Sequence, residues 1–383
     1  MNKKIDNQTL TLFFKGEIDS SNASKVEEEI EKDLASATFK KLVLDFRDIT
    51  YVSSAGLRII LKIKKKYQDV KITNVSLEVY DVFQMTGFTN IMDVYKALRK
   101  VDIEGAELIG EGYFSLVYRI NKDTIIKVFK NNHDIDSISK ELNLAKQAFI
   151  LGIPTAISFD IVEVGDRYGV VFEMLDSVCL RDLFLKYPDR FDELVDKYAK
   201  LVKTINSTEP MDDNLPDAKV AWINKVKEIK DHFEPKDFEK CLKLIESIPE
   251  KQTFVHGDCH FKNIMTQGDD LLLIDMETLS KGHHIFELAS LYSAYLTFEE
   301  DDPGNNERFF GVKKELSQKI FYTLLEKYMG YKNEELVDKI RIVSYLHVMW
   351  WNCINEPENL KRLGGCQDRL LKLIPKYDDL KID

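Results

Sequence analysis

The side chains best suited to chemistry lie in two short stretches, residues 256–263 and 271–277. They place Asp258, Asn263 and Asp275 at a spacing that fits phosphoryl transfer, which needs a carboxylate at the acceptor hydroxyl and oxygen ligands for Mg²⁺. In this interpretation Asp258 is the catalytic base, and Asn263 and Asp275 bind the metal. The alternative is a polar turn between two strands, which explains any one of these residues better than it explains the set.

A glycine-rich stretch upstream supplies the other half of a nucleotide site. Gly110, Gly112 and Ser115 lie in a loop that leads into a strand carrying Val117. Glycine lets a backbone approach phosphates closely, and Val117 is placed to pack on an adenine ring. Taken alone, this loop is just as typical of a simple β-hairpin.

One lysine stands inside the next predicted strand, residues 124–129. A single lysine in a strand is usually a solvated edge residue, but the downstream motif makes Lys127 the expected ligand of the α- and β-phosphates of ATP. Its expected ion-pair partner is Glu141, in a helix predicted over residues 139–149. The alternative for Glu141 is an ordinary surface position on that helix.

From about residue 107 to its C-terminus, the chain resembles the aminoglycoside phosphotransferase and choline kinase branch of the protein-kinase-like fold. The resemblance rests on the catalytic loop His-Gly-Asp-Cys-His-Phe-Lys-Asn and on Ile-Asp-Met-Glu at residues 274–277, where protein kinases have Asp-Phe-Gly. It implies a bilobal α+β fold, ATP and Mg²⁺ as cofactors, and a small hydroxyl compound as acceptor. Relatives usually have Asp at the position of Glu287, a residue that steadies the catalytic loop in the family.

A different pattern, in which strands and helices alternate, fills the first hundred residues. It predicts strands at residues 9–14 and 41–46, a turn at 16–19, a helix at 22–34, and a second helix that starts within 48–57. This pattern resembles the STAS domain of anti-sigma factor antagonists, an α/β fold with a mixed sheet and helices. The resemblance implies a regulatory or docking role, with an anti-sigma factor or another signalling protein as partner.

In the STAS family, a serine just before this helix is phosphorylated to switch the binding of a partner. Alignment on Asp48 and Gly56 places Ser54 at that position. Serine is also a preferred N-cap, so Ser53 and Ser54 both have a purely structural explanation. A phosphoryl group adds about −1.5 to −2 charges. Because a helix N-terminus favours anions by about 0.3–1 kcal/mol, the fold would tolerate this modification while an acidic partner would be repelled.

Composition bounds these interpretations. The chain has 383 residues, 44% hydrophobic and 31% charged, which is enough for two or three compact domains. Its net charge of −11 argues against nucleic acid or an anionic membrane as partner. No apolar run is long enough to span a bilayer and the polar N-terminus lacks a signal-peptide pattern, so we expect a cytoplasmic protein. The five scattered cysteines are expected to be free thiols.

The change of pattern along the chain predicts its domains. The segments are a STAS-like domain over residues 1–101, a short linker over 102–106, a kinase-like small lobe over 107–176 and a mostly helical large lobe over 177–383. The hinge between the lobes is expected at residues 172–175, where the backbone around Glu173 and Leu175 would bind adenine.

The sequence identifies the acceptor less well than it identifies the nucleotide site. The acidic run at residues 299–302 could attract a cationic substrate, and four aromatic residues could pack on an amine: Tyr292, Tyr295, Trp350 and Trp351. The alternative interpretations are a solvated acidic loop and aromatic residues of a helical core.

Three functions are compatible with the sequence. The first is an ATP-dependent phosphotransferase that acts on a small-molecule hydroxyl and carries a regulatory STAS domain. The second is a serine kinase that modifies Ser54 in its own chain, or a partner, in partner-switching signalling. The third is an inactive nucleotide-binding scaffold. The joint presence of Lys127, Asp258, Asn263 and Asp275 argues against the third, and the sequence favours the first.

Overall fold

The computed structural model describes every residue except 1, 113–114, 131–134, 176, 212–214 and 383. The chain divides into two compact units. The first unit comprises Met1–Asp102 with Val162–Asp166, and the second comprises Ile103–Ile161 with Arg167–Asp383. In the part of the chain that the structure describes, no helix is long and apolar enough to cross a membrane.

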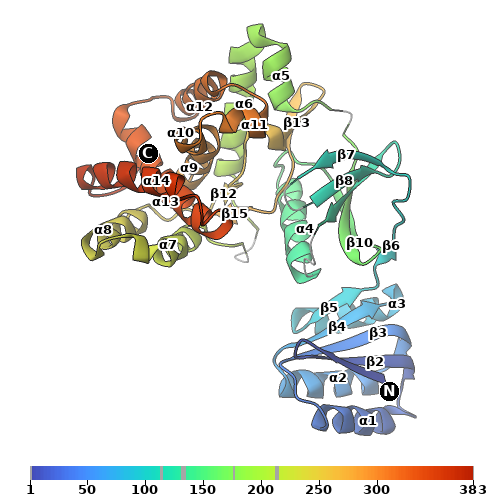
Figure 1. Cartoon of the computed structure of the whole chain (residues 1–383). Coiled ribbons are helices and arrows are strands. Elements are labelled where there is room, and N and C mark those ends of the chain that lie inside the picture. The colour runs from blue at the N-terminus through green and yellow to red at the C-terminus, as the bar shows by residue number, and fades with distance from the viewer. Residues whose placement is uncertain (1, 113–114, 131–134, 176, 212–214, 383) are drawn as a thin grey trace. The chain divides into compact units, whose positions relative to one another are not determined.

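The first unit is a five-stranded sheet with helices packed against it (Figure 1). Strand β1 is antiparallel to β2, whereas β2, β3, β4 and β5 run parallel and are joined by helical crossovers, so the sheet is mixed, as predicted. The elements are β1 (Asn2–Asp6), β2 (Thr9–Ile18), α1 (Ala23–Ala35), β3 (Lys41–Val52), α2 (Ser54–Lys66), β4 (Val70–Val75), α3 (Leu77–Met85), the 3₁₀ turn η1 (Phe88–Asn90), β5 (Asp93–Lys96) and the short β6 (Arg99–Lys100).

Alternation along the strands creates the core of this unit. In β2, Leu10 and Leu12 are fully buried, while Thr9 and Thr11 are only partly covered, as expected for a strand with one face towards a core. The ring of Phe46 from β3 packs between those of Phe14 and Phe83, at centroid distances of 5.0 and 6.0 Å. Phe83 belongs to α3, so aromatic contacts fix this helix on the buried face of the sheet.

The turn predicted at residues 16–19 is wrong for its first three positions. Strand β2 continues to Ile18, and its pairing with β3 changes register between Gly16 and Glu17. Gly16 has φ 83°, a conformation that glycine adopts without steric cost. Gly16 pairs with Ile49 and Glu17 pairs with Tyr51, so the extra residue of this bulge is Thr50 of β3. The conformation of Gly16 lets β2 continue beside the bulge instead of ending in a turn.

The second unit starts with a small lobe whose strands lie in the order β10-β11-β9-β8-β7. Helix α4 follows β9 and packs Ile138 and Leu142 against Phe129 and Val170 of the sheet. The elements are β7 (Glu107–Glu111), β8 (Ser115–Arg119), β9 (Thr124–Phe129), α4 (Ile135–Ile150), β10 (Ser158–Val164) and β11 (Arg167–Glu173).

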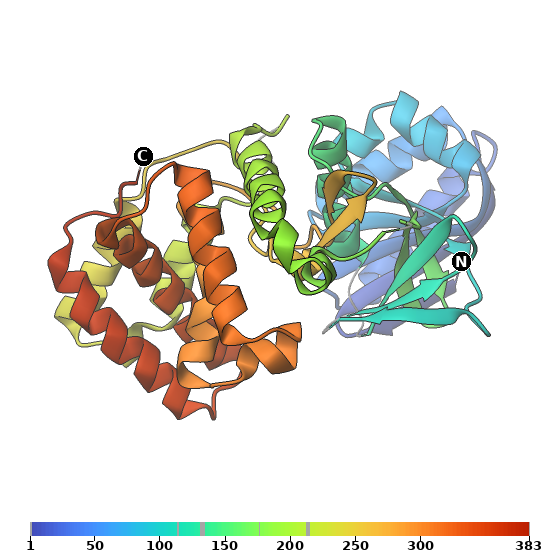
Figure 2. The same cartoon turned by 90° about the horizontal axis from the view of Figure 1, so that it is seen from above.

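The large lobe is mostly helical, as predicted, and in Figure 2 its yellow to red helices lie together. Helix α6 packs against α12, and α13 packs against α7, α9 and α14. The helices are α5 (Leu180–Lys186), α6 (Phe191–Ser207), α7 (Ala218–Glu228), α8 (Pro235–Glu246), α9 (Ile285–Tyr292), α10 (Phe298–Asp301), α11 (Asn305–Phe310), α12 (Lys314–Met329), α13 (Glu334–Asn355) and α14 (Leu360–Leu373). The short turns are η2 (Pro188–Arg190), η3 (Lys230–His232), η4 (Phe261–Asn263), the π-helical η5 (Ser293–Thr297) and η6 (Ile374–Lys376).

Four short strands complete the large lobe and carry the predicted catalytic segments: β12 (Phe254–Val255), β13 (Ile264–Gln267), β14 (Asp270–Leu273) and β15 (Ser280–Lys281). Strand β14 is buried along residues 271–273, in agreement with the sequence pattern. Leu273 N donates to Pro154 O at 2.8 Å, and Ala156 N donates to Leu273 O at 3.3 Å. The strand that precedes Asp275 is thus attached to the segment between α4 and β10 of the small lobe.

Candidate active site

The catalytic loop, residues 256–263, follows β12 and is held at its start by a buried carboxylate. Glu287 of α9 accepts hydrogen bonds from His256 N at 2.6 Å and from Gly257 N at 3.2 Å, and both Glu287 and His256 are fully buried. Burial raises the pKa of Glu287 to about 7, although the two backbone N–H groups favour its charged form. The longer acid at this position therefore reaches the loop backbone.

Two buried tyrosines hold the middle of the loop. Tyr198 of α6 donates its hydroxyl to Cys259 O, and the Tyr295 hydroxyl accepts a hydrogen bond from Phe261 N at 2.8 Å. The two hydroxyl groups lie 3.0 Å apart. Burial raises the pKa of both phenols well above the usual value, so they stay neutral and can both donate and accept.

Two further side chains complete the support of this backbone. Thr278 donates to His256 O at 2.6 Å, and Asn206 donates to Phe254 O at 2.9 Å. Sequence reasoning missed Thr278, Asn206 and Tyr198, and it considered Tyr295 only as a contact for an amine substrate. Each is an ordinary residue type far from the loop atom it binds in sequence. The one sequence signal was the acid at position 287, which the family resemblance implied.

The predicted base and one predicted metal ligand are in direct contact. Asn263 donates through Nδ2 to Asp258 Oδ2 at 2.8 Å and to Asp258 O at 2.9 Å, so its amide oxygen points elsewhere. Asp258 Oδ1 lies 3.4 Å from His260 Nε2. Burial lowers the pKa of His260 to about 4, so this neighbour is a neutral ring and not a counter-charge. The side chain of Asp258 keeps 47% of its surface exposed, which leaves it accessible to an acceptor.

Lys127 joins parts of the site that are far apart in sequence. Its Nζ lies 2.8 Å from Asp275 Oδ1 and 3.4 Å from Glu141 Oε1, and its side chain is only 11% exposed. Burial lowers the pKa of Lys127, but the two carboxylates outweigh burial and hold this pKa above its ordinary value. The structure therefore brings Lys127, Glu141 and Asp275 together as one charged cluster.

Asp275 is held in an unusual backbone conformation. Its φ of 65° lies in the left-handed region, which costs a residue other than glycine on the order of 1 kcal/mol or more. Immediately before it, Ile274 N donates to Asn263 O at 2.9 Å, so the catalytic loop and the end of β14 are bonded to each other. Burial raises the pKa of Asp275, but the charge of Lys127 outweighs burial and lowers this pKa below its usual range.

The two predicted metal ligands suit magnesium chemically. Mg²⁺ prefers oxygen ligands and is commonly bound by one or two protein groups together with substrate phosphates and water. Asn263 offers an amide oxygen and Asp275 a carboxylate. Within the described residues, no group of three or more His, Cys, Asp or Glu side chains is arranged to hold a metal ion. The donor types of Asn263 and Asp275 fit magnesium, and metal binding by them stays a prediction.

The described residues of the glycine-rich stretch lie at the facing ends of β7 and β8. Gly110 lies in β7, and Gly112 N donates to the backbone oxygen of the buried Ser115 at 2.9 Å. Residues 113–114 lie outside the described part of the chain. The contact of Gly110, Gly112 and Ser115 with phosphates stays a prediction.

The predicted adenine-binding residues lie around the same sheet. Val117 of β8 pairs directly with Lys127 of β9. At the hinge, the Glu173 carboxylate accepts a hydrogen bond from Ile157 N at 2.7 Å, and Glu173 N donates to Ile157 O at 3.0 Å. The side chain of Glu173 therefore anchors the hinge, and Leu175 follows two residues beyond the end of β11. Adenine binding by this backbone is untested and stays a prediction.

The acidic run at residues 299–302 is neither a solvated loop nor an open cation site. Glu299 accepts hydrogen bonds from Gly304 N and Asn306 N, both at 2.7 Å, and is 4% exposed. Glu300 lies 2.8 Å from Arg369 Nε. Asp301 also pairs with Arg369, and Asp302 pairs with Arg308 and Arg362. All four carboxylates have partners inside the fold.

The aromatic residues considered for an amine substrate also have partners in the fold. Trp350 Nε1 donates to Glu228 at 2.7 Å, and Lys225 Nζ lies 4.5 Å from the Trp350 ring centroid. The Tyr292 hydroxyl accepts from Arg341 Nε at 2.8 Å. The structure therefore favours a structural role for Tyr292 and Trp350, as it does for Tyr295.

The two serines at the start of α2 differ in their surroundings. The Ser53 hydroxyl caps the helix by accepting hydrogen bonds from Ala55 N at 3.2 Å and Gly56 N at 3.4 Å. Ser54 is the first residue of the helix and is exposed. The capping explanation therefore applies to Ser53.

A small lobe of strands with a paired lysine, joined to a helical lobe that carries Asp258, Asn263 and Asp275, is the architecture of a kinase-like phosphotransferase. A family model described as "Phosphotransferase enzyme family" matches residues 105–312, which is more than half of the chain, and a model described as "STAS domain" matches residues 1–101. The chain belongs to the phosphotransferase enzyme family and carries an N-terminal STAS domain.

The STAS domain also has a curated relative. Over 95 residues it is 30% identical to "Putative anti-sigma factor antagonist BtrV" of Bordetella bronchiseptica, an alignment that covers 24% of this chain and 80% of that protein.

Solved structures similar to this chain include a choline/ethanolamine kinase family protein and an aminoglycoside phosphotransferase. A choline/ethanolamine kinase family protein from Mesorhizobium loti is 13% identical, with 71% of this chain and 92% of that chain covered and a TM-score of 0.47. An ADP-bound aminoglycoside phosphotransferase is 15% identical, with 70% and 94% covered and a TM-score of 0.47.

We predict that Glu287→Ala lowers the free energy of unfolding of the second unit by about 2–4 kcal/mol. The buried N–H of His256 and the partly buried N–H of Gly257 lose their acceptor at about 1–3 kcal/mol each, and removal of the buried carboxylate recovers part of this loss. Urea denaturation followed by tryptophan fluorescence measures the change, since all three tryptophans lie in this unit. Glu287→Gln, which keeps one acceptor oxygen, should lose less than half as much. An alanine variant as stable as the unmodified chain would contradict this role.

Proposed function

We propose that the chain transfers the γ-phosphoryl group of ATP, in the presence of Mg²⁺, to a hydroxyl group of a small molecule, and that the STAS domain acts as a docking or regulatory module. The observation that carries this proposal is the contact of Lys127 with both Asp275 and Glu141, at 2.8 and 3.4 Å. Membership in the phosphotransferase enzyme family supports the reaction class.

Each residue of the site has a role in this proposal. Lys127 binds the α- and β-phosphates, and Glu141 holds the ammonium in place. Asn263 and Asp275 bind Mg²⁺, which would neutralise charge on the phosphates. Asp258 accepts the proton of the acceptor hydroxyl, and its hydrogen bond from Asn263 fixes the direction of the carboxylate. Because phosphoryl transfer depends on positioning, the rigid backbone of the catalytic loop contributes to the rate.

We predict that substitutions of Asp258 and Asp275 impair different steps, catalysis and nucleotide binding respectively. Asp258→Asn should keep nucleotide affinity and reduce turnover by on the order of 10² or more, because a base acts only in the transition state. Asp275→Ala should weaken magnesium-dependent ATP binding by about tenfold or more, since the metal loses its carboxylate ligand. Calorimetric titration with Mg-ATP and with ATP alone measures binding, and labelled ATP with a panel of hydroxyl compounds measures transfer.

Asp269→Ala, in the exposed turn between β13 and β14, is the matched control and should change neither quantity. If the folded, unmodified chain bound no nucleotide in the presence of magnesium, the phosphotransferase proposal would be wrong. If both variants retained full transfer, the proposal would survive and the roles of the two residues would not.

We predict that kcat/KM falls as the pH is lowered, and that this fall begins at a pH above the ordinary pKa of an aspartate. Burial raises the pKa of Asp258 to about 7, while the 47% exposure of its side chain places the operative value between the ordinary pKa and about 7. Asp258 must be deprotonated to act as a base, so the rate is full above this pKa and falls about tenfold per pH unit below it. The residual rate of Asp258→Asn should not show this fall of the rate at low pH. A fall that begins only below pH 4 would contradict the raised pKa.

A second candidate function is that of a serine kinase that acts on Ser54 or on a partner protein. The exposure of Ser54 favours it, because Ser53 already caps the helix and leaves the neighbouring hydroxyl available for modification. By analogy with its relative, the STAS domain would then bind an anti-sigma factor or another signalling protein.

We expect Ser54 to remain unmodified in most molecules when the full chain is incubated with Mg-ATP, because a hydroxyl at a helix start does not easily enter an active site. Intact-mass measurement tests this expectation. A stoichiometric gain of one phosphate that is lost in Ser54→Ala, but kept in Ser53→Ala, would favour the serine kinase. Consumption of ATP only after a small hydroxyl compound is added would favour the first function.

A further inference from the structure

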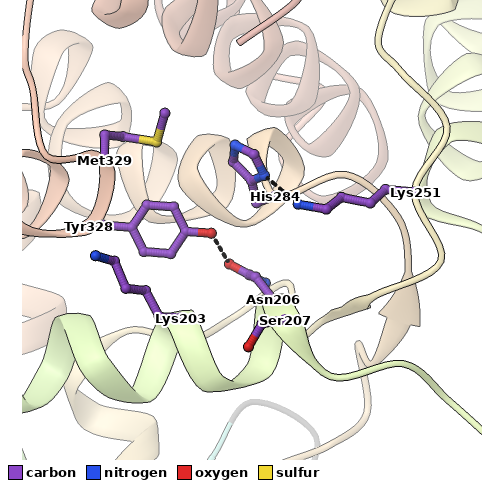
Figure 3. A pocket seen from close by; sticks show the side chains of 7 residues that line it. All are labelled: Lys203, Asn206, Ser207, Lys251, His284, Tyr328 and Met329. Carbon is purple, nitrogen blue, oxygen red and sulfur yellow. Dashed lines mark hydrogen bonds between the residues drawn. The ribbon is translucent and has the colours of Figure 1, made fainter. Parts of the chain in front are cut away.

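A pocket in the large lobe is lined by none of the residues that act in the proposed transfer reaction. It has a volume of about 410 Å³, which suits a small ligand, and lies between α6, the start of α9 and α12 (Figure 3). Its lining residues are mainly polar or basic: Lys203, Asn206, Ser207, Lys251, His284, Tyr328 and Met329.

Two lysines give this pocket a positive charge. Lys251 Nζ lies 3.3 Å from His284 Nδ1, and Lys203 Nζ lies 6.0 Å from the ring centroid of Tyr328. Among the described residues, neither ammonium forms an ion pair with a carboxylate. Both lysines are exposed. In a chain with a net charge of −11, two cations without acidic partners in one pocket indicate a site for an anion.

His284 reinforces this electrostatic character. Burial, together with His283 and Lys251, lowers the pKa of His284 to about 3, so the ring is neutral and does not compensate a charge. An ammonium only donates, so Nδ1 is the acceptor and the ring proton is on Nε2. That nitrogen is buried and has no hydrogen-bond partner among the described residues. The site thus contains a buried polar group that its own fold leaves unsatisfied.

Asn206 connects the pocket to the catalytic loop. Its Oδ1 accepts from the Tyr328 hydroxyl at 3.0 Å, as drawn in Figure 3, and its Nδ2 donates to Phe254 O at 2.9 Å. Asn206 also lowers the pKa of Glu287, the residue that binds the first two N–H groups of the loop, and so favours its charged form. His284 immediately precedes α9, the helix that carries Glu287. The pocket therefore shares its lining with the support of the loop.

We propose that this pocket binds a small oxyanion, a phosphomonoester or carboxylate on a compact molecule, and that occupancy stabilises the catalytic loop through Asn206. The two ammonium groups recognise the anion, as charge-assisted donors do for phosphate and carboxylate. The Tyr328 ring and Met329 provide an apolar wall for the body of the ligand. A ligand that orders Asn206 and Tyr328 also orders the Phe254 carbonyl and the Glu287 carboxylate, which fixes the loop in one arrangement.

Calorimetric titration of the full chain tests the binding site. The probes are phenyl phosphate, benzoate and inorganic phosphate at constant ionic strength, with the nucleotide site saturated by magnesium and a non-hydrolysable ATP analogue. We expect saturable binding, tighter for the aromatic probes than for inorganic phosphate. The comparison of phenyl phosphate with benzoate distinguishes a phosphomonoester site from a carboxylate site.

Four variants assign the binding to this pocket. Lys203→Met and Lys251→Met should each raise the Kd by about tenfold, the expected effect of losing one charge-assisted hydrogen bond. Lys200→Met, at an exposed position of the same helix, should leave the Kd unchanged. Lys127→Met, titrated without nucleotide beside the unmodified chain without nucleotide, should also leave the Kd unchanged, so this test remains valid if the proposed ATP site fails. No binding by any probe, or equal binding by both pocket variants, would overturn the site.

Hydrogen exchange tests the connection to the loop. The amides of His256 and Gly257, which donate to Glu287, should exchange several-fold more slowly when the best probe is bound, whereas amides of the STAS sheet should not change. Unchanged exchange at these two amides in the saturated protein would show that the pocket is not coupled to the loop.

Discussion

The geometry of the site depends on one buried carboxylate. Glu287 has no solvent exposure, yet it accepts hydrogen bonds from two consecutive N–H groups of the catalytic loop. A charge in such a place is stable only because these donors replace water, and the donors are satisfied only because the carboxylate is present. This mutual requirement holds the backbone turn at Gly257, whose φ of 80° is strained for any other residue. This turn sets the direction in which the side chain of Asp258 leaves the backbone.

Much of the fold is encoded locally and could be predicted. The strand around Lys127 and the buried strand before Asp275 are short apolar runs with polar boundaries, and both occur where the pattern indicates. The supports of the catalytic loop could not be predicted in the same way. Tyr198 and Tyr295 lie 61 and 34 residues from the loop atoms they bind, and a tyrosine in a helix gives no sign of its partner. Tertiary contact, and not sequence spacing, assigns these roles.

Two features of the STAS domain also could not be predicted from the sequence alone. A glycine followed by polar residues is typical of a turn, and the sequence alone gave no reason to continue the strand past Gly16. The parallel pairing with β3 supplies that reason, because backbone groups on both sides of the bulge find partners in the neighbouring strand. At the start of α2, two adjacent serines are equivalent on propensity, and only the backbone conformation at Ser53 decides which hydroxyl caps the helix.

The charged cluster around Lys127 constrains what can enter the proposed nucleotide site. Its ammonium is already neutralised by Asp275 and Glu141, so a bare polyphosphate would have to displace a carboxylate and leave it buried and unpaired. A polyphosphate that carries a divalent cation allows an exchange of partners, in which the lysine turns to phosphate and Asp275 turns to the cation. Lys127 and Asp275 would then each keep a partner of opposite charge. The cluster would therefore bind the metal complex of a nucleotide in preference to the metal-free nucleotide.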